Sequence, residues 1–172
     1  MDKVFTMPDK RFGRIKILIL DVDGVMTDGR IILNDHGEET KSFDVKDGYG
    51  IRMLLDAGVH IAIITGRQSR VVEHRARDLG IKLVYQGVKD KKAACIKVLE
   101  ETRLTSDQAC CIGDDLPDIP LLRYIGMPVA VADAVKEVRE TAQYITEKNG
   151  GNGAVREVCE LILRAQDART IK

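Results

Sequence analysis

The sequence has no excess charge of either sign, because its 27 lysines and arginines are balanced by 27 aspartates and glutamates. A chain without net charge has no general attraction to nucleic acid or to an anionic membrane, so any anion must be recognised locally. Charges interrupt every apolar stretch well before 18 residues, which argues against a membrane span. The first 14 residues also contain no apolar signal-peptide core. These absences predict a cytoplasmic protein that binds neither nucleic acid nor a membrane.

The sequence also lacks the CxxC pairs that hold zinc or form redox disulfides. Its four cysteines are Cys95, Cys110, Cys111 and Cys159, and we expect them to be buried reduced thiols. There is no detectable repeat, low-complexity tract or linker, and 44% of the 172 residues are apolar. This length and composition predict a single domain over residues 1–172.

Short apolar runs alternate with helical patterns along the chain. The strand-like runs cover residues 15–20, 60–65, 82–86, 109–113 and 128–132. The helical patterns lie near residues 48–57, 69–79, 91–103 and 117–124, and Gly58, Gly80 and Gly126 follow three of them where a left-handed C-cap is expected. Continuous apolar strands that alternate with helices are typical of a parallel sheet covered on both faces. We therefore predict an α/β fold with a doubly wound, mostly parallel sheet.

The connection between the first strand and the first helix is too long for an ordinary loop of this kind. Within it, residues 28–46 contain two short strand-like stretches around Asn34–Gly37, which predicts a β-hairpin. The hairpin would overhang the carboxyl end of the first strand. Because long loops in compact domains usually act as lids or binding elements, we interpret it as a flap over a site.

Polar side chains follow three of the predicted strands at their carboxyl ends, where open parallel sheets bind ligands. The first strand ends in Asp21-Val22-Asp23-Gly24 and the second in Thr65-Gly66-Arg67. The fourth ends in an acidic segment with Asp114, Asp115 and Asp118, and Lys91 and Lys92 open the helix before that strand. Carboxylates, a hydroxyl and an ammonium group should therefore meet at one edge of the sheet.

This set of groups suits magnesium-assisted phosphoryl transfer. Mg²⁺ takes oxygen ligands and keeps some waters, and Asp21 and Asp114 could supply two carboxylates. A carboxylate can also attack phosphorus to give an aspartyl phosphate. Thr65 and Lys91 would then bind the phosphoryl oxygens. Since the chain turns at Gly24, Asp23 can swing out and act as a proton donor to the leaving oxygen.

Simpler interpretations exist for most of these residues. A calcium loop around Asp21 fails on spacing, because Gly24 falls at position 4 and Ile32 at position 12. Asp21 could be a polar strand end, Thr65 could cap the following helix, and Lys91 with Lys92 could form a solvated helix face. Arg67 and Arg75 could form surface salt bridges, and Asp115 and Asp118 could cap the next helix.

The sequence resembles the haloacid-dehalogenase-like phosphatases in their four motifs. In order along the chain, the matching stretches are DVDGVMTDG, ITGR, the first lysine of DKKAA and GDDLPD. The chain further resembles the 3-deoxy-D-manno-octulosonate 8-phosphate (KDO 8-phosphate) phosphatase family. This second resemblance rests on the stretches GEETKSFDVKDGYGIRML, ITGRQSRVVEHRARDLGI, YQGVKDK, AVADA and GGNGAVREVCELIL. Members of that family are small, cap-less magnesium phosphatases that form tetramers. They release phosphate from an eight-carbon sugar acid used in lipopolysaccharide assembly.

The resemblance implies a role for each motif residue. Asp21 would be the nucleophile and Asp23 the general acid, which later acts as the base. Asp21, the backbone carbonyl of Asp23 and Asp114 would hold Mg²⁺, and Thr65 and Lys91 would hold the phosphoryl group. Asp115 and Asp118 would orient the groups around the metal. The residues implied to contact the substrate are Gly66, Arg67, Arg75, Lys91 and Arg156.

Three other functions are alternatives to hydrolysis of an eight-carbon substrate. Related phosphatases that act on nine-carbon, sialic-acid-type phosphates carry glutamate at the position of Arg67, where a guanidinium suits a sugar carboxylate better. A phosphorylatable receiver domain combines similar groups, but it orders them differently along its strands and has no equivalent of Asp23. A non-catalytic relative that only binds sugar phosphates should have lost Asp21 or Asp23.

The C-terminal segment 149–167 contains a glycine loop followed by a predicted helix. Asn152 is a candidate cap for that helix, which carries Arg156. In the family that the chain resembles, this segment approaches a neighbouring subunit's site. A homotetramer would then complete each active site in trans, with the flap hairpins at subunit contacts. On this view, removal of the residues after Gly150 should lower activity without unfolding the core.

Overall fold

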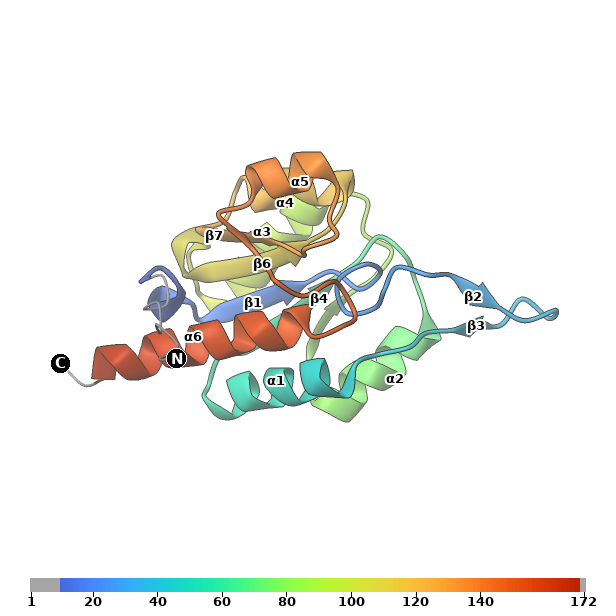
Figure 1. Ribbon diagram of the computed structural model, residues 1–172, viewed down its shortest axis with the longest axis horizontal. Coiled ribbons are helices and arrows are strands. Elements are labelled where there is room, and N and C mark those ends of the chain that lie inside the picture. Colours follow the sequence, from blue (N-terminus) through green and yellow to red (C-terminus); the bar gives the residue numbers. More distant parts are fainter. Residues whose placement is uncertain (1–9, 171–172) are drawn as a thin grey trace, which may run out of the picture.

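A computed structural model describes residues 10–170 of the chain. We expect no signal-peptide core in residues 1–14. Residues 1–9 of that stretch lie outside the described range. In the described part, no helix is long and apolar enough to cross a membrane. The chain folds into a central sheet with helices on both faces and a hairpin that projects from one end (Figure 1).

The sheet has six strands in the order β5-β4-β1-β6-β7-β8, and every neighbouring pair is parallel. The strands are β1 (Ile17–Leu20), β4 (His60–Ile64), β5 (Leu83–Tyr85), β6 (Ala109–Gly113), β7 (Met127–Ala130) and β8 (Tyr144–Ile145). β1 is buried throughout because it lies between β4 and β6 and is covered on both faces. The predicted doubly wound α/β fold is confirmed. The two-residue edge strand β8 was not predicted.

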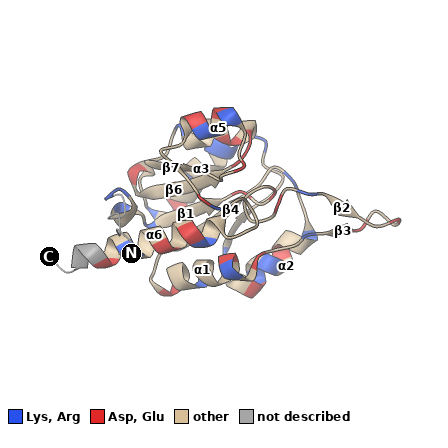
Figure 2. Cartoon of the chain, viewed as in Figure 1, with Lys and Arg blue, Asp and Glu red and all other residues tan. Residues whose placement is uncertain are grey.

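Helices form a layer on each side of the sheet (Figure 1). One layer contains α1 (Val45–Asp56), α2 (Arg70–Leu79) and α6 (Ala154–Thr170), and the other contains α3 (Lys91–Thr102), α4 (Ile119–Leu122) and α5 (Lys136–Thr141). Three short 3₁₀ helices, η1 (Phe12–Arg14), η2 (Ser106–Gln108) and η3 (Leu116–Asp118), complete the described helices. Basic and acidic residues alternate along α2, α5 and α6, as expected for a chain without net charge (Figure 2).

The glycines that follow the helices have different roles. Gly58 and Gly80 lie just beyond α1 and α2 with φ angles of +78° and +81°, the left-handed conformation that was predicted. Gly126 does not adopt a positive φ, so the prediction of a left-handed cap there is wrong. A Cβ atom at Gly126 would lie 2.6 Å from the Cα of Asp107. Close contact with η2, rather than backbone conformation, requires glycine at this position.

The predicted hairpin is present as β2 (Ile32–Leu33) and β3 (Glu39–Thr40), paired antiparallel. The Asn34 side chain accepts hydrogen bonds from the backbone N–H groups of His36 and Glu38 and so fixes the turn. The hairpin stands away from the body of the molecule (Figure 1). It therefore leaves about half of the surface of three apolar residues exposed, namely Ile31, Ile32 and Leu33.

Helix α6 packs closely against α1. A Cβ atom at Gly50 of α1 would lie 3.1 Å from the Cα of Arg156, so the two helices approach each other at a glycine. One face of α6 is part of the hydrophobic core through Val155, Val158, Cys159 and Ile162. The expectation that the core would survive removal of the residues after Gly150 is therefore wrong, because that truncation deletes a wall of the core.

The start of α6 is capped from another helix. The buried carboxylate of Asp47, in α1, accepts hydrogen bonds from the backbone N–H groups of Arg156 (2.7 Å) and Gly153 (3.4 Å). The side chain of Asn152, the predicted cap, instead donates to the carbonyl oxygen of Gly150. Burial, opposed by these backbone hydrogen bonds, raises the pKa of Asp47 to about 6.

This cap leads to a test of stability against pH. The raised pKa means that the folded protein holds a proton on Asp47 more tightly than the unfolded chain does, so this group loses stability as pH rises between about 3.8 and about 6. Asp47→Asn keeps an acceptor but cannot ionise. The free energy of unfolding of wild type should therefore fall relative to that of Asp47→Asn between pH 4 and pH 7, measured by urea denaturation.

Asp47→Ala provides the matching test of the hydrogen bonds. It leaves two backbone donors without their acceptor, and we expect a loss of about 1–3 kcal/mol at pH 4, where Asp47 of the folded wild type is protonated. If the free energies of unfolding of wild type and Asp47→Asn differ by the same amount at every pH, the raised pKa of Asp47 is contradicted.

Candidate active site

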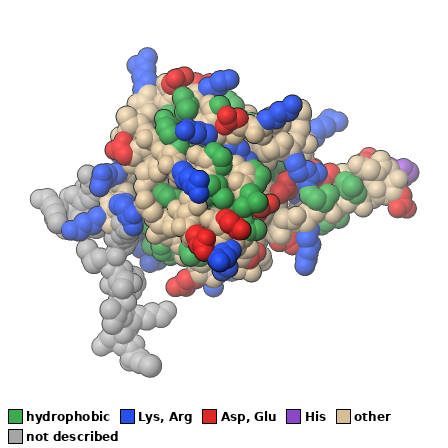
Figure 3. Space-filling view, turned by 90° about the horizontal axis from the view of Figure 1, so that it is seen from above, with side chains coloured by type: hydrophobic (Ala, Val, Ile, Leu, Met, Phe, Trp, Pro, Cys, Tyr) green, Lys and Arg blue, Asp and Glu red, His purple; other side chains and the backbone are tan. Residues whose placement is uncertain are grey.

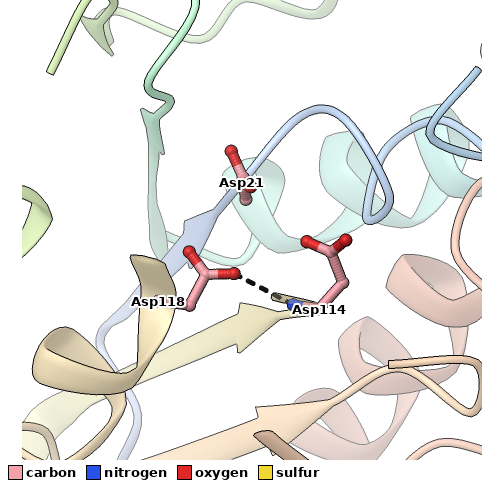
Figure 4. Close-up of side chains that lie close together, drawn as sticks. All are labelled: Asp21, Asp114 and Asp118. Carbon is pink, nitrogen blue, oxygen red and sulfur yellow. Dashed lines mark hydrogen bonds between the residues drawn. The ribbon is translucent and has the colours of Figure 1, made fainter. Parts of the chain in front are cut away.

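Three carboxylates converge at the carboxyl ends of the central strands (Figure 4). Asp21 follows β1, Asp114 follows β6, and Asp118 ends η3. Each contributes an oxygen atom, and these oxygens all lie within 4.8 Å of one another. Since β1 and β6 are neighbours in register, with Leu20 opposite Ile112, the fold brings Asp21 and Asp114 to the same level of the sheet.

Asp118 ties this group to the backbone. Its Oδ2 atom accepts hydrogen bonds from the backbone N–H groups of Asp114 (3.0 Å) and Asp115 (3.3 Å). A Cβ atom at Gly113 would lie 2.8 Å from Asp118, so glycine is required for the side chain to fold back in this way. The exposed Asp115 accepts from the N–H of Leu116 at 2.7 Å, so it caps η3, as its simpler interpretation proposed.

Lys91 is the cation among these carboxylates. It is the first residue of α3 and is only 7% exposed. Its Nζ atom lies 2.8 Å from Asp21 and 2.5 Å from Asp118. Burial alone would lower the pKa of Lys91, but the two carboxylates outweigh it and raise the pKa above its ordinary value. Lys92 instead lies over the ring of Tyr124, so the structure distinguishes the two lysines that the sequence could not.

The carboxylates outnumber their partners in this cluster. Burial, together with the nearby charges of Asp21 and Asp118, raises the pKa of Asp114 to about 8. Burial also raises the pKa of Asp21, against the opposing effect of Lys91. The Oδ1 atoms of Asp21 and Asp114 are buried and accept no hydrogen bond within the described chain. Two unpaired carboxylate oxygens side by side fit a hard divalent cation such as Mg²⁺.

Thr65 follows β4 and is buried beside this cluster of strand ends. It does not cap α2, because Ser69 is the residue that precedes that helix. Its backbone bonds to neighbouring segments, with its N–H donating to Tyr85 and its carbonyl accepting from Val88. The hydroxyl is thus carried by a fixed backbone.

Asp23 begins the turn that contains Gly24, two residues after Asp21. Gly24 has a φ of +92°, and a Cβ atom there would lie 2.0 Å from Asp114. Both the conformation and the close approach therefore require glycine. The N–H groups of Val25, Met26 and Thr27 all donate to the carbonyl of Val22, which closes the loop.

The C-terminal glycine loop supports this turn from within the same chain. The N–H of Gly151 donates to the carbonyl of Val25 at 2.9 Å. A Cβ atom at Gly150 would lie 1.7 Å from the carbonyl oxygen of Gly24. The N–H of Gly150 is held by Asp133 at 3.0 Å. In the described chain the glycine loop therefore buttresses the Asp23 loop in cis, a contact that sequence reasoning missed.

Three residues at the base of the hairpin and the start of α2 were also missed. Glu39, Lys41 and Ser69 join Arg67 in a network around Asp23. The hydrogen bond from Ser69, followed by Lys41 and Arg67, lowers the pKa of Glu39 against the effect of burial. Glu39 and Lys41 are two residues apart at the end of the hairpin, so strand periodicity could have placed them on one face.

Two residues implied as substrate contacts have other partners. Arg75 forms a salt bridge with Asp78 at 2.9 Å and lies over the ring of Phe43. Arg156 pairs with Glu160 at 2.7 Å and lies over Tyr49. The structure does not join either side chain to the carboxylate cluster. Gly66 lies between Thr65 and Arg67, at the edge of the site.

Comparison with known proteins agrees with this geometry. Residues 84–158 match the model of the haloacid dehalogenase-like hydrolases. The KDO 8-phosphate phosphatase KdsC of Yersinia pestis is 49% identical over 158 residues, which cover 92% of this chain and 84% of that protein. The chain belongs to the KDO 8-phosphate phosphatase family. The resemblance seen in the motifs is thereby confirmed.

Solved structures of KDO 8-phosphate phosphatases have the same fold. The Yersinia pestis enzyme superimposes with a TM-score of 0.91 at 49% identity, covering 92% of this chain and 85% of that one. The Moraxella catarrhalis enzyme gives 0.90 at 43% identity, covering 95% and 97%. That second structure is a complex with a magnesium ion, a phosphate ion and KDO. Nothing in these comparisons favours a receiver domain.

The carboxylate cluster leads to a test of cation binding. In wild type, Mg²⁺ at a hundredfold excess over its Kd should add about 2.7 kcal/mol to the free energy of unfolding. Asp114→Asn removes the negative charge of one of the two carboxylates that would hold the cation, so this gain should largely disappear. Without divalent ions at pH 8, the variant should be at least as stable as wild type, because it avoids burying a charge beside Asp21.

Thermal or urea unfolding with and without Mg²⁺ measures both effects. Asp56→Asn, at an exposed position on α1, is the matched control and should respond to Mg²⁺ as wild type does. An equal gain in Asp114→Asn and wild type would show that the cation binds elsewhere.

Proposed function

We propose that this chain is a magnesium-dependent phosphomonoesterase that hydrolyses KDO 8-phosphate to KDO and inorganic phosphate, a step in the supply of lipopolysaccharide precursors. The observation that carries the proposal is the buried cluster of Asp21, Asp114, Asp118 and Lys91 at the sheet edge, in a chain of this family. Such a cluster is costly without a cation to balance its surplus negative charge.

Asp21 is the proposed nucleophile. One of its oxygens attacks phosphorus, an aspartyl phosphate forms, and the ester bond to the sugar oxygen breaks. Asp23 gives its proton to that leaving oxygen. Water then attacks the aspartyl phosphate, Asp23 takes a proton from the water, and inorganic phosphate and free Asp21 result. Two observations support these roles: β1, which precedes Asp21, is buried throughout, and Asp23 begins the turn that contains Gly24.

The other residues bind and orient. Lys91, held between Asp21 and Asp118, and the hydroxyl of Thr65 would bind phosphoryl oxygens. Asp21, Asp114 and the carbonyl of Asp23 would hold Mg²⁺, which supplies positive charge to the phosphoryl group when bound. Asp118, and Asp115 beside it, would fix the orientation of Asp114.

Arg67 is the proposed contact for the sugar acid. Its guanidinium lies 3.7 Å from Asp23 and is 44% exposed, so it lies at the rim where a substrate enters. A positive charge there favours a sugar carboxylate, and this supports the eight-carbon substrate over relatives that carry glutamate. For Gly66, Arg75 and Arg156, contact with the substrate stays a prediction.

Turnover measurements test this function. Purified protein with Mg²⁺ should hydrolyse KDO 8-phosphate with a higher kcat/KM than N-acetylneuraminate 9-phosphate or its KDN counterpart. Asp21→Asn should reduce kcat by at least about 10³-fold, because no nucleophile remains, while circular dichroism stays unchanged. A higher kcat/KM for a nine-carbon substrate would contradict the role of Arg67, and substantial activity in Asp21→Asn would contradict the nucleophile.

We further propose that the protein is a cytoplasmic homotetramer with its hairpins at subunit contacts, and that residues 1–172 form one domain. The exposed apolar residues Ile31, Ile32 and Leu33 support the contacts, because they lie together on a hairpin that stands away from the core (Figure 3). Four free, buried thiols support a reducing compartment. A shared hydrophobic core that includes both β1 and α6 supports one domain.

The hairpin contact can be tested by light scattering after gel filtration. Ile32→Asp with Leu33→Asp should convert the tetramer to a smaller species, because charge would be buried at the contact. Ile145→Asp alters a similarly exposed isoleucine on the edge strand β8 of the main sheet, 46% against 45% for Ile32, and should leave the tetramer intact. A monomeric wild type, or a tetrameric double variant, would contradict the proposal.

A further inference from the structure

Lys41 is a buried cation that the chemistry described so far does not use. It follows β3, at the point where the hairpin returns to the body of the protein. Its side chain is only 1% exposed, although the hairpin itself is exposed. Its Nζ atom contacts Oδ1 of Asp23 and lies 3.2 Å from Oε1 of Glu39. An ammonium group is buried in this way only when carboxylates compensate for the lost water.

Glu39 anchors this lysine to the rest of the site. Its Oε1 atom also accepts a hydrogen bond from Nη2 of Arg67 at 2.7 Å, and its Oε2 atom accepts one from the hydroxyl of Ser69. Arg67 and Ser69 belong to the segment between β4 and α2, which the sheet fixes. The base of the hairpin is therefore tied to the body of the protein immediately beside Asp23.

Two cations contact the carboxylate of Asp23. In the described chain its carboxylate contacts Lys41 and, at 3.7 Å, Arg67. Its backbone lies in a loop, and its side chain is only 18% exposed. The Arg67 contact is long, and Arg67 itself is 44% exposed, so it constrains Asp23 less than the buried lysine does.

We propose that Lys41 is a positioning residue for the proton donor. Lys41 holds the Asp23 carboxyl on the side of the leaving oxygen, and Glu39 holds Lys41. This inference rests on the proposed function, in which Asp23 donates its proton as the ester bond breaks. It adds that the hairpin supplies part of the catalytic geometry from within the same chain.

The proton transfer makes the proposal testable, because esters differ in how much they need it. When a sugar phosphate reacts, the leaving oxygen would depart as a strongly basic alkoxide, so it has to take the proton of Asp23. When p-nitrophenyl phosphate reacts, a stable phenolate departs without a proton. Loss of the position of Asp23 should therefore slow the first ester much more than the second, whereas damage to the phosphate site should slow both equally.

The experiment compares kcat/KM for KDO 8-phosphate and p-nitrophenyl phosphate, since kcat/KM reports the steps up to cleavage of the ester. Lys41→Met should lower the value for the sugar phosphate about 10- to 100-fold, the effect of a misplaced group, and change that for the aryl ester less than about threefold. Lys41→Arg should restore part of the loss. Glu39→Gln should shift the ratio in the same direction, and it tests the proposal independently if Lys41→Met does not fold.

Lys46→Met is the matched control, because Lys46 is an exposed lysine five residues further along the chain. The kcat/KM values of this variant for both esters should match those of wild type. Equal losses on both esters in Lys41→Met, or no loss on either, would overturn the proposal. If wild type does not hydrolyse KDO 8-phosphate, the proposed substrate fails. The role of Lys41 is then judged by the same comparison between glycerol 3-phosphate and p-nitrophenyl phosphate.

Discussion

The burial of three carboxylates around one ammonium group is the interaction on which this structure depends. Asp21, Asp114 and Asp118 meet Lys91 at the edge of the sheet, so the fully ionised cluster carries a formal charge of −3 + 1 = −2. Hydrophobic burial of β1 and β6 supplies the free energy that holds them there, because neither strand can move without exposing the core. The raised pKa values of Asp21 and Asp114 are the consequence. A divalent cation balances the surplus, so the energetic cost of the apo fold and its capacity to bind Mg²⁺ have one cause.

The two acidic residues of the first motif are held in different ways, and this difference suits the different tasks proposed for them, nucleophile and proton donor. Asp21 is fixed by the strand that precedes it, which lies at the centre of the sheet. Asp23 lies beyond the sheet, and three distant parts of the chain determine its position. The glycine loop at Gly150 supports the backbone of the turn that contains Asp23, and Asp114 packs against Gly24 in the same turn. The hairpin brings Lys41 to the carboxylate of Asp23. A nucleophile must not move, whereas a proton donor has to reach the leaving oxygen and later a water molecule. A loop held by several contacts can allow such movement when a buried strand cannot.

Much of this arrangement could be predicted from the sequence because it depends on local pattern. Apolar runs give the strands, parallel strands bring their carboxyl ends together, and Asp21, Thr65 and Asp114 follow from that alone. The failures concern contacts between distant segments. Nothing in the periodicity shows that Asp47 rather than Asn152 caps α6, that Gly126 serves close contact with Asp107, or that Gly150 lies against Gly24. Which of Lys91 and Lys92 faces the site depends on the rotation of α3 about its axis, roughly 100° per residue, and only packing fixes that rotation.

The network around Asp23 differs from the carboxylate cluster in its charge balance. Two carboxylates, Asp23 and Glu39, meet two cations, Lys41 and Arg67, so this network is formally neutral. A neutral network can form without a metal ion, and the base of the hairpin can therefore be held in place before any cation or substrate arrives. The surplus of negative charge lies instead in the cluster of Asp21, Asp114 and Asp118, where Mg²⁺ and the phosphoryl group would bind. Because Arg67 belongs to the neutral network and also lies at the rim, a sugar carboxylate that binds to it meets a guanidinium already shared with Glu39. If Arg67 binds the sugar acid as proposed, recognition of the substrate and the anchoring of the hairpin depend on the same side chain, and substrate choice is linked to the geometry of proton transfer.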